Sequence, residues 1–247
     1  MRYIASCSGG KDSVATLLLA KEQGEPLDEV VYCEVMFDRE TSGEIPEHRE
    51  FIYSQVKPFV ENELNVPFTV LRSKKTYLDV FSHVVCRGDH AGRVRGFAIP
   101  GMCAINRDCK IPPIREYWKA KGADVTQYVG IAADEPERLA RLQGTNRVSL
   151  LDKYSFTEQD AKALCRKYGL LSPVYDITDR NGCWFCPNCK DDEWAHMIKN
   201  HPTLFDRLVS LEHNTPNIYR ACLTRTETPT QLKSRILSYG DQLSLFD

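Results

Sequence analysis

The chain has 247 residues, of which 42% are hydrophobic and 27% are charged, and its formal net charge is −2. This length is enough for one sizeable core, or for a core domain with an appendage. The near-neutral charge excludes a strong overall basic field for bulk nucleic acid, and no apolar run approaches the ~18 residues of a membrane-spanning helix.

Strand and helix patterns alternate along the first half of the chain. The expected strands lie at residues 2–6, 29–37, 67–73 and 125–133, and the expected helices at 14–21, 47–63 and 111–122. Pro58 is expected to kink the second helix. The alternation predicts a Rossmann-like α/β fold, in which a parallel sheet is covered by helices and ligands bind beyond the carboxyl ends of the strands.

A capped helix closes this alternating part of the chain. Thr157 is its expected cap and Gly169 its expected end. A cysteine-rich loop and short helical patterns follow. We therefore predict an α/β domain at residues 1–170 and a small, Cys-rich, mostly helical C-terminal region with a flexible tail at residues 171–247.

The stretch SCSGGKDS at residues 6–13 joins the first strand to the first helix. A strand, a Gly-Gly turn and a helix N-terminus together make an anion site, because unpaired N–H groups and the helix dipole favour negative charge. Gly9 and Gly10 let the backbone approach a phosphate, and Lys11 adds a full positive charge. The hydroxyl donors of the stretch are Ser6, Ser8 and Ser13.

Two familiar phosphate loops do not fit this stretch. A Walker loop needs glycine where this chain has Ala5, and Ser or Thr where it has Asp12. The dinucleotide fingerprint G-x-G-x-x-G is absent as well.

The stretch SGGKDS resembles the PP-loop of the ATP pyrophosphatases, in the adenine-nucleotide alpha-hydrolase superfamily, and more closely that of the phosphoadenosine-phosphosulfate-reductase-like branch. Other segments similar to that branch are FDRETSGEIPEHREF (37–51), CKIPPIREYW (109–118), GIAADEPERL (130–139) and DRNGCWFCP (179–187). The resemblance implies a HUP-type Rossmann-like domain that binds an adenine nucleotide. The residues it implies for the phosphates are Ser8, Gly9, Gly10, Lys11, Asp12 and Ser13, with Asp38 near the nucleotide.

In the ATP-using relatives, a substrate oxygen attacks the α-phosphate, and pyrophosphate leaves. The resemblance therefore implies catalytic roles for Lys11, Asp12 and Asp38, with Mg²⁺ assisting the departure of pyrophosphate. The carboxylates expected near the metal are Asp12, Asp38 and Asp134; a solvated strand end is the alternative for Asp134.

The N-terminal sequence has no signal-peptide pattern, which predicts a cytoplasmic protein. Ten cysteines are many for such a protein. Reduced thiols there favour metal or redox chemistry over disulfides. Cys183, Cys186 and Cys189 follow one another at C-x-x-C spacing. With Cys103 and Cys109 before the Lys-Ile-Pro-Pro helix, their order resembles the [4Fe–4S] ligands of some sulfonucleotide reductases, and we expect four of the five to bind a cluster.

Zinc is the alternative metal. Cys183, Cys186, His196 and His201 have the order C-x2-C-x9-H-x4-H, which is feasible for one tetrahedral ion. Unliganded core thiols are the remaining interpretation.

The glycine- and arginine-rich residues 86–103 predict a mobile basic loop. Arg93 and Arg95 are its candidate phosphate-binding residues, and an ordinary solvated loop is the alternative.

The chain ends in Gln-Leu-Ser-Leu-Phe, from Gln242 to Phe246. This segment resembles the short peptide by which bacterial proteins dock on the DNA sliding clamp, while a tail folded back onto the core is the alternative.

Three functions follow from these patterns. The first is an ATP-dependent enzyme that adenylates an unidentified acceptor, for sulfur transfer or a related modification of a nucleic acid or metabolite. The second is a sulfonucleotide reductase, against which the absence of the family's C-terminal Glu-Cys-Gly-Leu-His-like tail counts; the last cysteine is Cys222. The third is a nucleotide-binding accessory subunit without turnover. The sequence predicts no oligomeric state.

Overall fold

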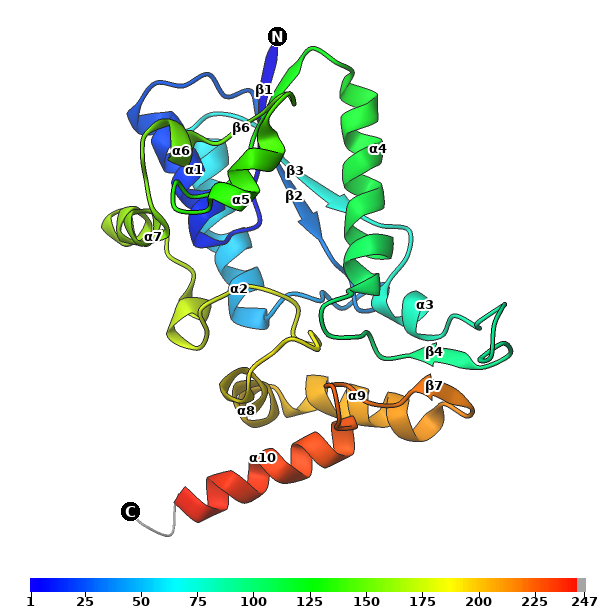
Figure 1. Ribbon diagram of the computed structural model, residues 1–247. Helices are drawn as coiled ribbons and strands as arrows, with labels where there is room; N and C mark the ends of the chain where they lie inside the picture. The colour runs from blue at the N-terminus through cyan, green and yellow to red at the C-terminus, as the bar shows by residue number, and fades with distance from the viewer. Residues whose placement is uncertain (244–247) are drawn as a thin grey trace. The chain divides into compact units, whose positions relative to one another are not determined.

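A five-stranded parallel sheet forms the centre of the N-terminal fold in the computed structural model, which describes residues 1–243 (Figure 1). The strands follow the order β3-β2-β1-β5-β6. Their bounds are Arg2–Ser6 (β1), Glu29–Glu34 (β2), Phe68–Arg72 (β3), Val125–Tyr128 (β5) and Arg147–Val148 (β6). The order reverses between β1 and β5, which makes the carboxyl end of β1 the place where such sheets bind ligands. The predicted α/β class is confirmed.

Packing divides the chain into two compact units. The first comprises Met1–Glu34, Ile45–Arg72 and Pro113–Asn181, and the second comprises Val35–Glu44, Ser73–Pro112 and Gly182–Asp247. Each unit therefore takes its residues from three separate segments. The division into domains near residue 170 stays a prediction.

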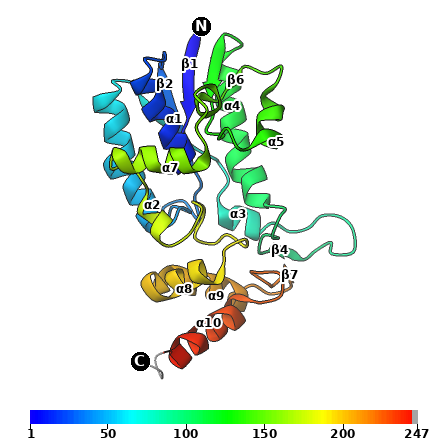
Figure 2. The same ribbon diagram turned by 60° about the vertical axis from the view of Figure 1, so that its left-hand side comes forward.

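Helices cover both faces of the sheet in the first unit. Their bounds are Lys11–Glu22 (α1), Pro46–Phe51 (α2), Ile111–Lys121 (α4), Pro136–Leu139 (α5), Leu150–Lys153 (α6) and Glu158–Lys167 (α7). On one face, the sheet is covered by α4 (Figure 1). Tyr117 and Trp118 of this helix pack against the cluster of Ile4, Val31 and Val125. On the other face, α1 packs on the sheet and α7 packs against α1 (Figure 2).

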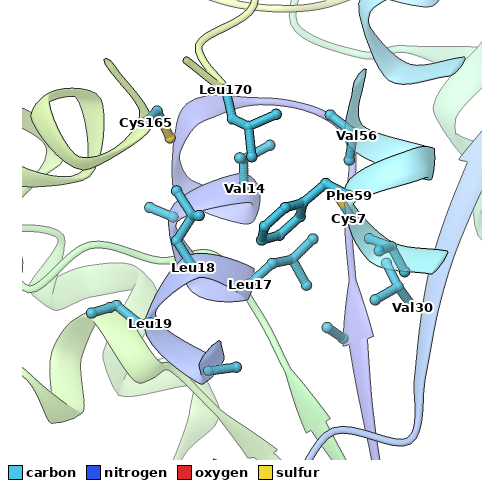
Figure 3. Packing of buried hydrophobic residues seen from close by; sticks show 14 of the residues in the cluster. Cys7, Val14, Leu17, Leu18, Leu19, Val30, Val56, Phe59, Cys165 and Leu170 are labelled. Carbon is cyan, nitrogen blue, oxygen red and sulfur yellow. The ribbon is translucent and has the colours of Figure 1, made fainter. Parts of the chain in front are cut away.

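The α1 helix is buried on nearly all sides because the sheet lies on one side of it and α7 on the other. Val14, Leu17 and Leu18 are fully buried, and Figure 3 shows them among Phe59, Leu170 and neighbouring apolar side chains. Cys7 and Cys165 lie in the same cluster, and Cys33 is also buried. The core thus fixes α1, whose N-terminal end carries the last residues of the SCSGGKDS stretch.

The expected helix at 47–63 is present but is wider than an α-helix over much of its length. After α2, the chain forms π-helical turns at Ile52–Val56 and Phe59–Glu63, on either side of Pro58. Leu64 donates its N–H to the carbonyl of Phe59, five residues back, at 3.1 Å. Because proline has no N–H to donate, the wider turns accommodate Pro58 without ending the helix.

The second unit is mostly helical and contains a small second sheet. Its helices and strands are α3 (Tyr77–Phe81), β4 (Val94–Gly96), a π-helical turn at Asn106–Lys110, α8 (Asp191–Asn200), α9 (Pro202–Asn214), β7 (Ile218–Arg220) and α10 (Pro229–Leu243). The helices α8, α9 and α10 pack together (Figure 2), and β4 pairs with β7 in parallel.

Residues 86–103 are more regular than the predicted mobile loop. Residues 94–96 form β4, and the carbonyl of Arg93 accepts the N–H of Val85 at 2.9 Å. Gly96 has φ +83°, and a Cβ there would lie 2.4 Å from the carbonyl oxygen of Arg220, so the glycine allows the close pairing with β7.

The C-terminal peptide predicted to dock on the sliding clamp falls largely outside the described residues. Gln242 and Leu243 are the last residues of α10, and residues 244–246 lie beyond. Within residues 1–243, no helix has both the length and the apolar composition needed to span a membrane.

Candidate functional site

The loop at residues 8–13 follows β1 at the switch point of the sheet and leads into α1. Gly9 has φ +74°, and a Cβ at this position would lie 2.5 Å from Cγ1 of Ile52, so only glycine fits. The hydroxyl of Ser13 donates to the Gly10 carbonyl at 2.9 Å and accepts the N–H of Ser8 at 3.1 Å. The loop is therefore closed by its own residues into a compact turn at a helix N-terminus, as an anion site requires.

Three side chains that the sequence did not single out hold this loop. His48, which is fully buried, bridges the Ser8 carbonyl (2.9 Å from Nε2) and the Ser172 hydroxyl (2.8 Å from Nδ1). Asn181 donates to the Ser8 carbonyl at 3.3 Å, and Tyr175 accepts the N–H of Lys11 at 2.9 Å. These contacts join residues 40 to 173 positions apart, so no local pattern marks them. Of the three, His48 and Asn181 fall in segments that the resemblance had included, FDRETSGEIPEHREF and DRNGCWFCP, although neither residue was given a role there.

Gly130, the first residue of GIAADEPERL, packs directly against the start of α1. A Cβ at this position would lie 2.6 Å from the Ser13 nitrogen and 2.7 Å from the Asp12 carbonyl carbon. Both atoms belong to backbone that the buried core holds in place. The motif after β5 therefore keeps the loop after β1 in position.

We expect Gly130→Ala to push the start of α1 away and to destabilise the protein by about 1–3 kcal/mol, as overpacking does. Thermal unfolding should show a midpoint lower by roughly 2–10 °C. The matched control is Gly144→Asn, because Gly144 has open space around it and asparagine tolerates its φ of +70°. Equal midpoints for the two variants would contradict the packing role of Gly130.

The charge of Lys11 is balanced by two carboxylates. Its Nζ lies 2.9 Å from Asp12 and 3.2 Å from Glu158. Burial opposes the charge of Lys11, but the hydrogen bonds and charges of Asp12 and Glu158 outweigh burial and raise the Lys11 pKa. Burial also raises the pKa of Asp12 in spite of Lys11, and the charges of Glu158 and Glu135 add to this effect. An incoming phosphate must compete with these carboxylates for Lys11, and a divalent cation would relieve their repulsion.

Ser6 and Asp134 make structural contacts in the first unit. The Ser6 hydroxyl accepts from the amide of Gln127 on the neighbouring strand at 2.8 Å. The Asp134 carboxylate accepts the first N–H of α7, from Glu158, at 3.1 Å. These contacts favour sheet and capping roles, while their predicted roles at the nucleotide and the metal stay predictions.

Asp38 lies in the second unit, where it anchors a tight turn. Its carboxylate accepts the N–H groups of Thr41 at 2.6 Å and Glu40 at 2.8 Å, and it pairs with the guanidinium of Arg207. Burial opposes its ionisation, but Arg207 and these N–H groups outweigh burial and lower the pKa of Asp38 to about 2. The Asp38 carboxylate is therefore already hydrogen-bonded and paired with a cation within the second unit. Its catalytic role stays a prediction.

The Asp38 contacts predict a pH-dependent contribution to stability. Because the folded pKa of about 2 lies below the ordinary value near 3.9, the stabilisation is present above pH ~4 and is lost as the pH falls towards 2. We expect Asp38→Asn to cost about 1–2 kcal/mol at pH 6 and much less at pH 2.5. Urea unfolding of both proteins at the two pH values measures the difference. A loss of the same size at both values would contradict the assignment.

Arg93 and Arg95 also have partners within the second unit. Arg93 donates to the Ile218 carbonyl at 2.6 Å and lies over the Tyr219 ring, and Arg95 lies 3.4 Å from the Asp108 carboxylate. The first contact joins the segment before β4 to β7, and the second joins β4 to the π-helical turn at Asn106–Lys110. Their predicted role at phosphates stays a prediction.

All five candidate cysteine ligands belong to the second unit. In the CWFC segment, Trp184 and Phe185 are buried and pack on Phe37 at ring-centroid distances of 4.7 and 5.6 Å. The indole N–H of Trp184 donates to the Ser42 carbonyl at 2.9 Å. The two aromatic residues thus anchor the segment between Cys183 and Cys186 in an apolar cluster.

Hydrogen bonds between backbone atoms give the cysteine loop two consecutive turns. The N–H of Cys186 donates to the Cys183 carbonyl at 3.1 Å, and that of Cys189 to the Cys186 carbonyl at 3.0 Å. Burial raises the pKa of Cys183 well above its ordinary value, with smaller contributions that include Cys186 and Cys103. The thiol of Cys103 is therefore near enough to contribute to the raised pKa of Cys183, although 80 residues separate the two in the sequence.

Cys103 also connects this loop to the fifth candidate. Its sulfur accepts the N–H of Asn106 at 3.3 Å, at the start of the π-helical turn that contains Cys109. Cys109 is fully buried, and burial, with contributions from Asp108 and others, raises its pKa to about 12. Such thiols are protonated until a metal displaces the proton. An apolar, thiol-rich site of this kind fits an iron–sulfur cluster.

The zinc alternative differs in the spacing that it needs. Two sulfurs at about 2.3 Å and two imidazole nitrogens at about 2.0 Å from one ion would lie within about 4 Å of one another. Within residues 1–243, no group of three ligand atoms within 4.8 Å of one another includes a cysteine. His196 is hydrogen-bonded to Asn200 at 2.9 Å on α8. Within the described residues, Cys183, Cys186, His196 and His201 therefore do not form a group with the spacing of a single ion, and zinc stays the alternative prediction.

No protein-family model matches the chain, and no curated protein matches it. Among solved structures, the chain is similar to the U34-tRNA thiolase NcsA from Methanococcus maripaludis with its [4Fe–4S] cluster. The sequence identity is 15% and the TM-score 0.43, over 98% of this chain and 72% of that chain. Membership of the PP-loop superfamily and of the sulfonucleotide-reductase-like branch stays a prediction from the motifs.

Proposed function

We propose that the protein is an ATP-dependent enzyme that adenylates an acceptor and releases pyrophosphate. The observation that carries this proposal is the closed Gly-Gly turn before α1, at the switch point of a parallel sheet, with Lys11 at the first helical position. A helix N-terminus, glycines that admit close approach and a half-buried lysine together suit a nucleotide's phosphates.

The proposed step is an attack on the α-phosphorus. An acceptor oxygen forms the new O–P bond, the bond between the α-phosphorus and the bridging oxygen breaks, and pyrophosphate leaves with the electron pair. The loop's contribution is to hold the phosphates and to oppose the charge that develops on the leaving group through Lys11. Sulfur or nitrogen would then attack the activated acceptor carbon and release AMP.

Mg²⁺ is the cation that this chemistry requires, and Asp12 is the carboxylate best placed to assist it in the first unit. It lies on the first turn of α1 beside Lys11, and its charge is already repelled by Glu158 and Glu135. A divalent cation held there with the phosphates would favour the ionised carboxylate.

The second unit would hold a [4Fe–4S] cluster through Cys103, Cys183, Cys186 and either Cys109 or Cys189. A cluster supplies redox or sulfur-binding chemistry when it is present. The chain's own contribution is the aromatic layer of Phe37, Trp184 and Phe185, which excludes water on one side of CWFC.

The products of ATP consumption test the proposed activity. We expect anaerobically purified protein, supplied with Mg²⁺, α-labelled ATP and pools of small RNA or metabolites as acceptors, to form labelled AMP and an equal amount of pyrophosphate. Labelled ADP with inorganic phosphate would contradict α-phosphorus attack. ATP binding without either product, across all acceptor pools, would favour the accessory subunit.

A further inference from the structure

We propose that Arg49 and Arg72 form a second anion site at the carboxyl edge of the sheet, which binds a phosphate group other than the triphosphate of ATP. The site adds a substrate-binding group to the proposed function but does not depend on ATP turnover. The phosphate could belong to the acceptor, or be an additional phosphate on the nucleotide.

A buried carboxylate organises the two arginines. Glu34 is the last residue of β2 and is fully buried. Its Oε1 accepts from Nε of Arg49 at 2.8 Å, and its Oε2 accepts from Nε and Nη2 of Arg72 at 2.9 and 2.6 Å. The Tyr53 hydroxyl donates to Oε2 at 2.9 Å. Burying a carboxylate is costly, and these four donors compensate it.

The arginines themselves reach solvent. The side chain of Arg49 is 43% exposed and that of Arg72 is 49% exposed, whereas Glu34 is 0% exposed. Two guanidinium groups share one carboxylate, so the cluster carries one surplus positive charge. Among the described residues, Nη1 and Nη2 of Arg49 and Nη1 of Arg72 make no hydrogen bond within the protein. Forked donors of this kind match the oxygens of phosphate.

Rigid elements fix the direction of these donors. Arg72 is the last residue of β3 and is the direct register partner of Glu34. Arg49 lies on α2 one turn before Tyr53, and its guanidinium stacks on the Tyr53 ring at 4.7 Å. Both side chains are therefore ordered before a ligand arrives, which lowers the entropic cost of binding.

The position of the pair favours a substrate role over a purely structural one. Parallel α/β sheets bind ligands beyond the carboxyl ends of their strands, and Glu34 and Arg72 are both the terminal residues of their strands. The phosphate loop follows β1, the neighbour of β2, and adjacent strands lie about 4.8 Å apart. His48, which contacts the loop at Ser8, is the residue before Arg49. One substrate, or two adjacent substrates, could engage both sites.

The test compares phosphate-bearing probes on the wild type and on Arg49→Gln/Arg72→Gln. The probes are adenosine 3′,5′-bisphosphate, AMP and a single-stranded oligoribonucleotide, titrated by calorimetry at fixed salt. If the nucleotide supplies the phosphate, the variant should bind the bisphosphate about tenfold more weakly and AMP unchanged. If the acceptor supplies the phosphate, the variant should bind the oligoribonucleotide about tenfold more weakly than the wild type does, and its affinity for the bisphosphate should be unchanged. Unchanged affinity for both would overturn the proposal.

Two further proteins make the test decisive. If the double variant unfolds because Glu34 loses its partners, Glu34→Gln/Arg49→Gln/Arg72→Gln removes all three charges and takes its place. Lys167→Gln is the control for a lost surface cation, since Lys167 pairs with Glu22 on α1. ATP affinity, measured separately, reports on the phosphate loop, so failure of the arginine site and failure of the proposed function give different results.

Discussion

Replacing Lys11 with alanine should weaken ATP binding by about 100-fold. Lys11 is the only full positive charge within the SGGKDS loop, and its side chain is only 11% exposed, so no solvent ion replaces it at close range. Loss of one charge-assisted interaction with phosphate in such a site corresponds to about 2.7 kcal/mol. Calorimetric titration with ATP and Mg²⁺ measures the change.

The matched control is Lys21→Ala. Lys21 lies on the same helix, at its opposite end, where it pairs with Glu63 at 2.8 Å. The two variants remove the same side chain from α1, but only one removes it from the loop. Equal ATP affinities for Lys11→Ala and Lys21→Ala would show that the nucleotide does not bind at this loop.

Replacing Cys183 with alanine should reduce bound iron and sulfide from about four of each per chain to near zero. Cys183 and Cys186 are both half-buried, and the thiols of Cys186 and Cys103 contribute to the raised pKa of Cys183, which places Cys183 between the two cysteine segments. The measurement is iron and acid-labile sulfide after anaerobic purification, together with the visible absorption of the protein.

Cys86→Ala is the control for this variant, because Cys86 is an exposed cysteine of the same unit outside the candidate set. It should retain the full iron content. One equivalent of zinc, without iron, in the wild type would contradict the cluster and favour the Cys183, Cys186, His196 and His201 alternative.

Local sequence patterns predicted the elements of the sheet well and the loop contacts poorly. The strands at 2–6 and 67–73 and the capped helix ending at Gly169 follow from period, caps and glycine position, all of which act over a few residues. The Thr157 cap is present, with its hydroxyl accepting the N–H of Asp160.

The remaining features depend on contacts between distant residues. His48 meets Ser8, and Glu34 meets Arg72, only because β1, β2 and β3 lie side by side. The expected strand at 29–37 ends at Glu34, because the following residues leave the sheet and join the second unit. The apolar composition of residues 35–37 does not reveal that the strand ends before them. Val35, Met36 and Phe37 are buried in the second unit, and the same side chains would suit a buried strand equally well.

The arginine-rich segment shows the same limit. Its glycines and charges are typical of a solvated loop, and the sequence alone does not reveal that residues 218–220, more than 120 positions away, supply a parallel partner for β4. Arg93 is therefore engaged by the Ile218 carbonyl. Composition describes a segment's own preference, whereas pairing depends on which other segment is available.

The central claim is that the SGGKDS loop binds ATP for adenylation. It is tested most directly by titrating anaerobically purified protein with ATP and Mg²⁺, with adenylyl sulfate and with its 3′-phosphorylated form. We expect the wild type to bind ATP with Mg²⁺ more tightly than either sulfonucleotide, and we expect Lys11→Ala to lose this tight binding of ATP. Tighter binding of either sulfonucleotide would contradict the claim and favour reduction, with Cys222 then the first cysteine to test as its nucleophile.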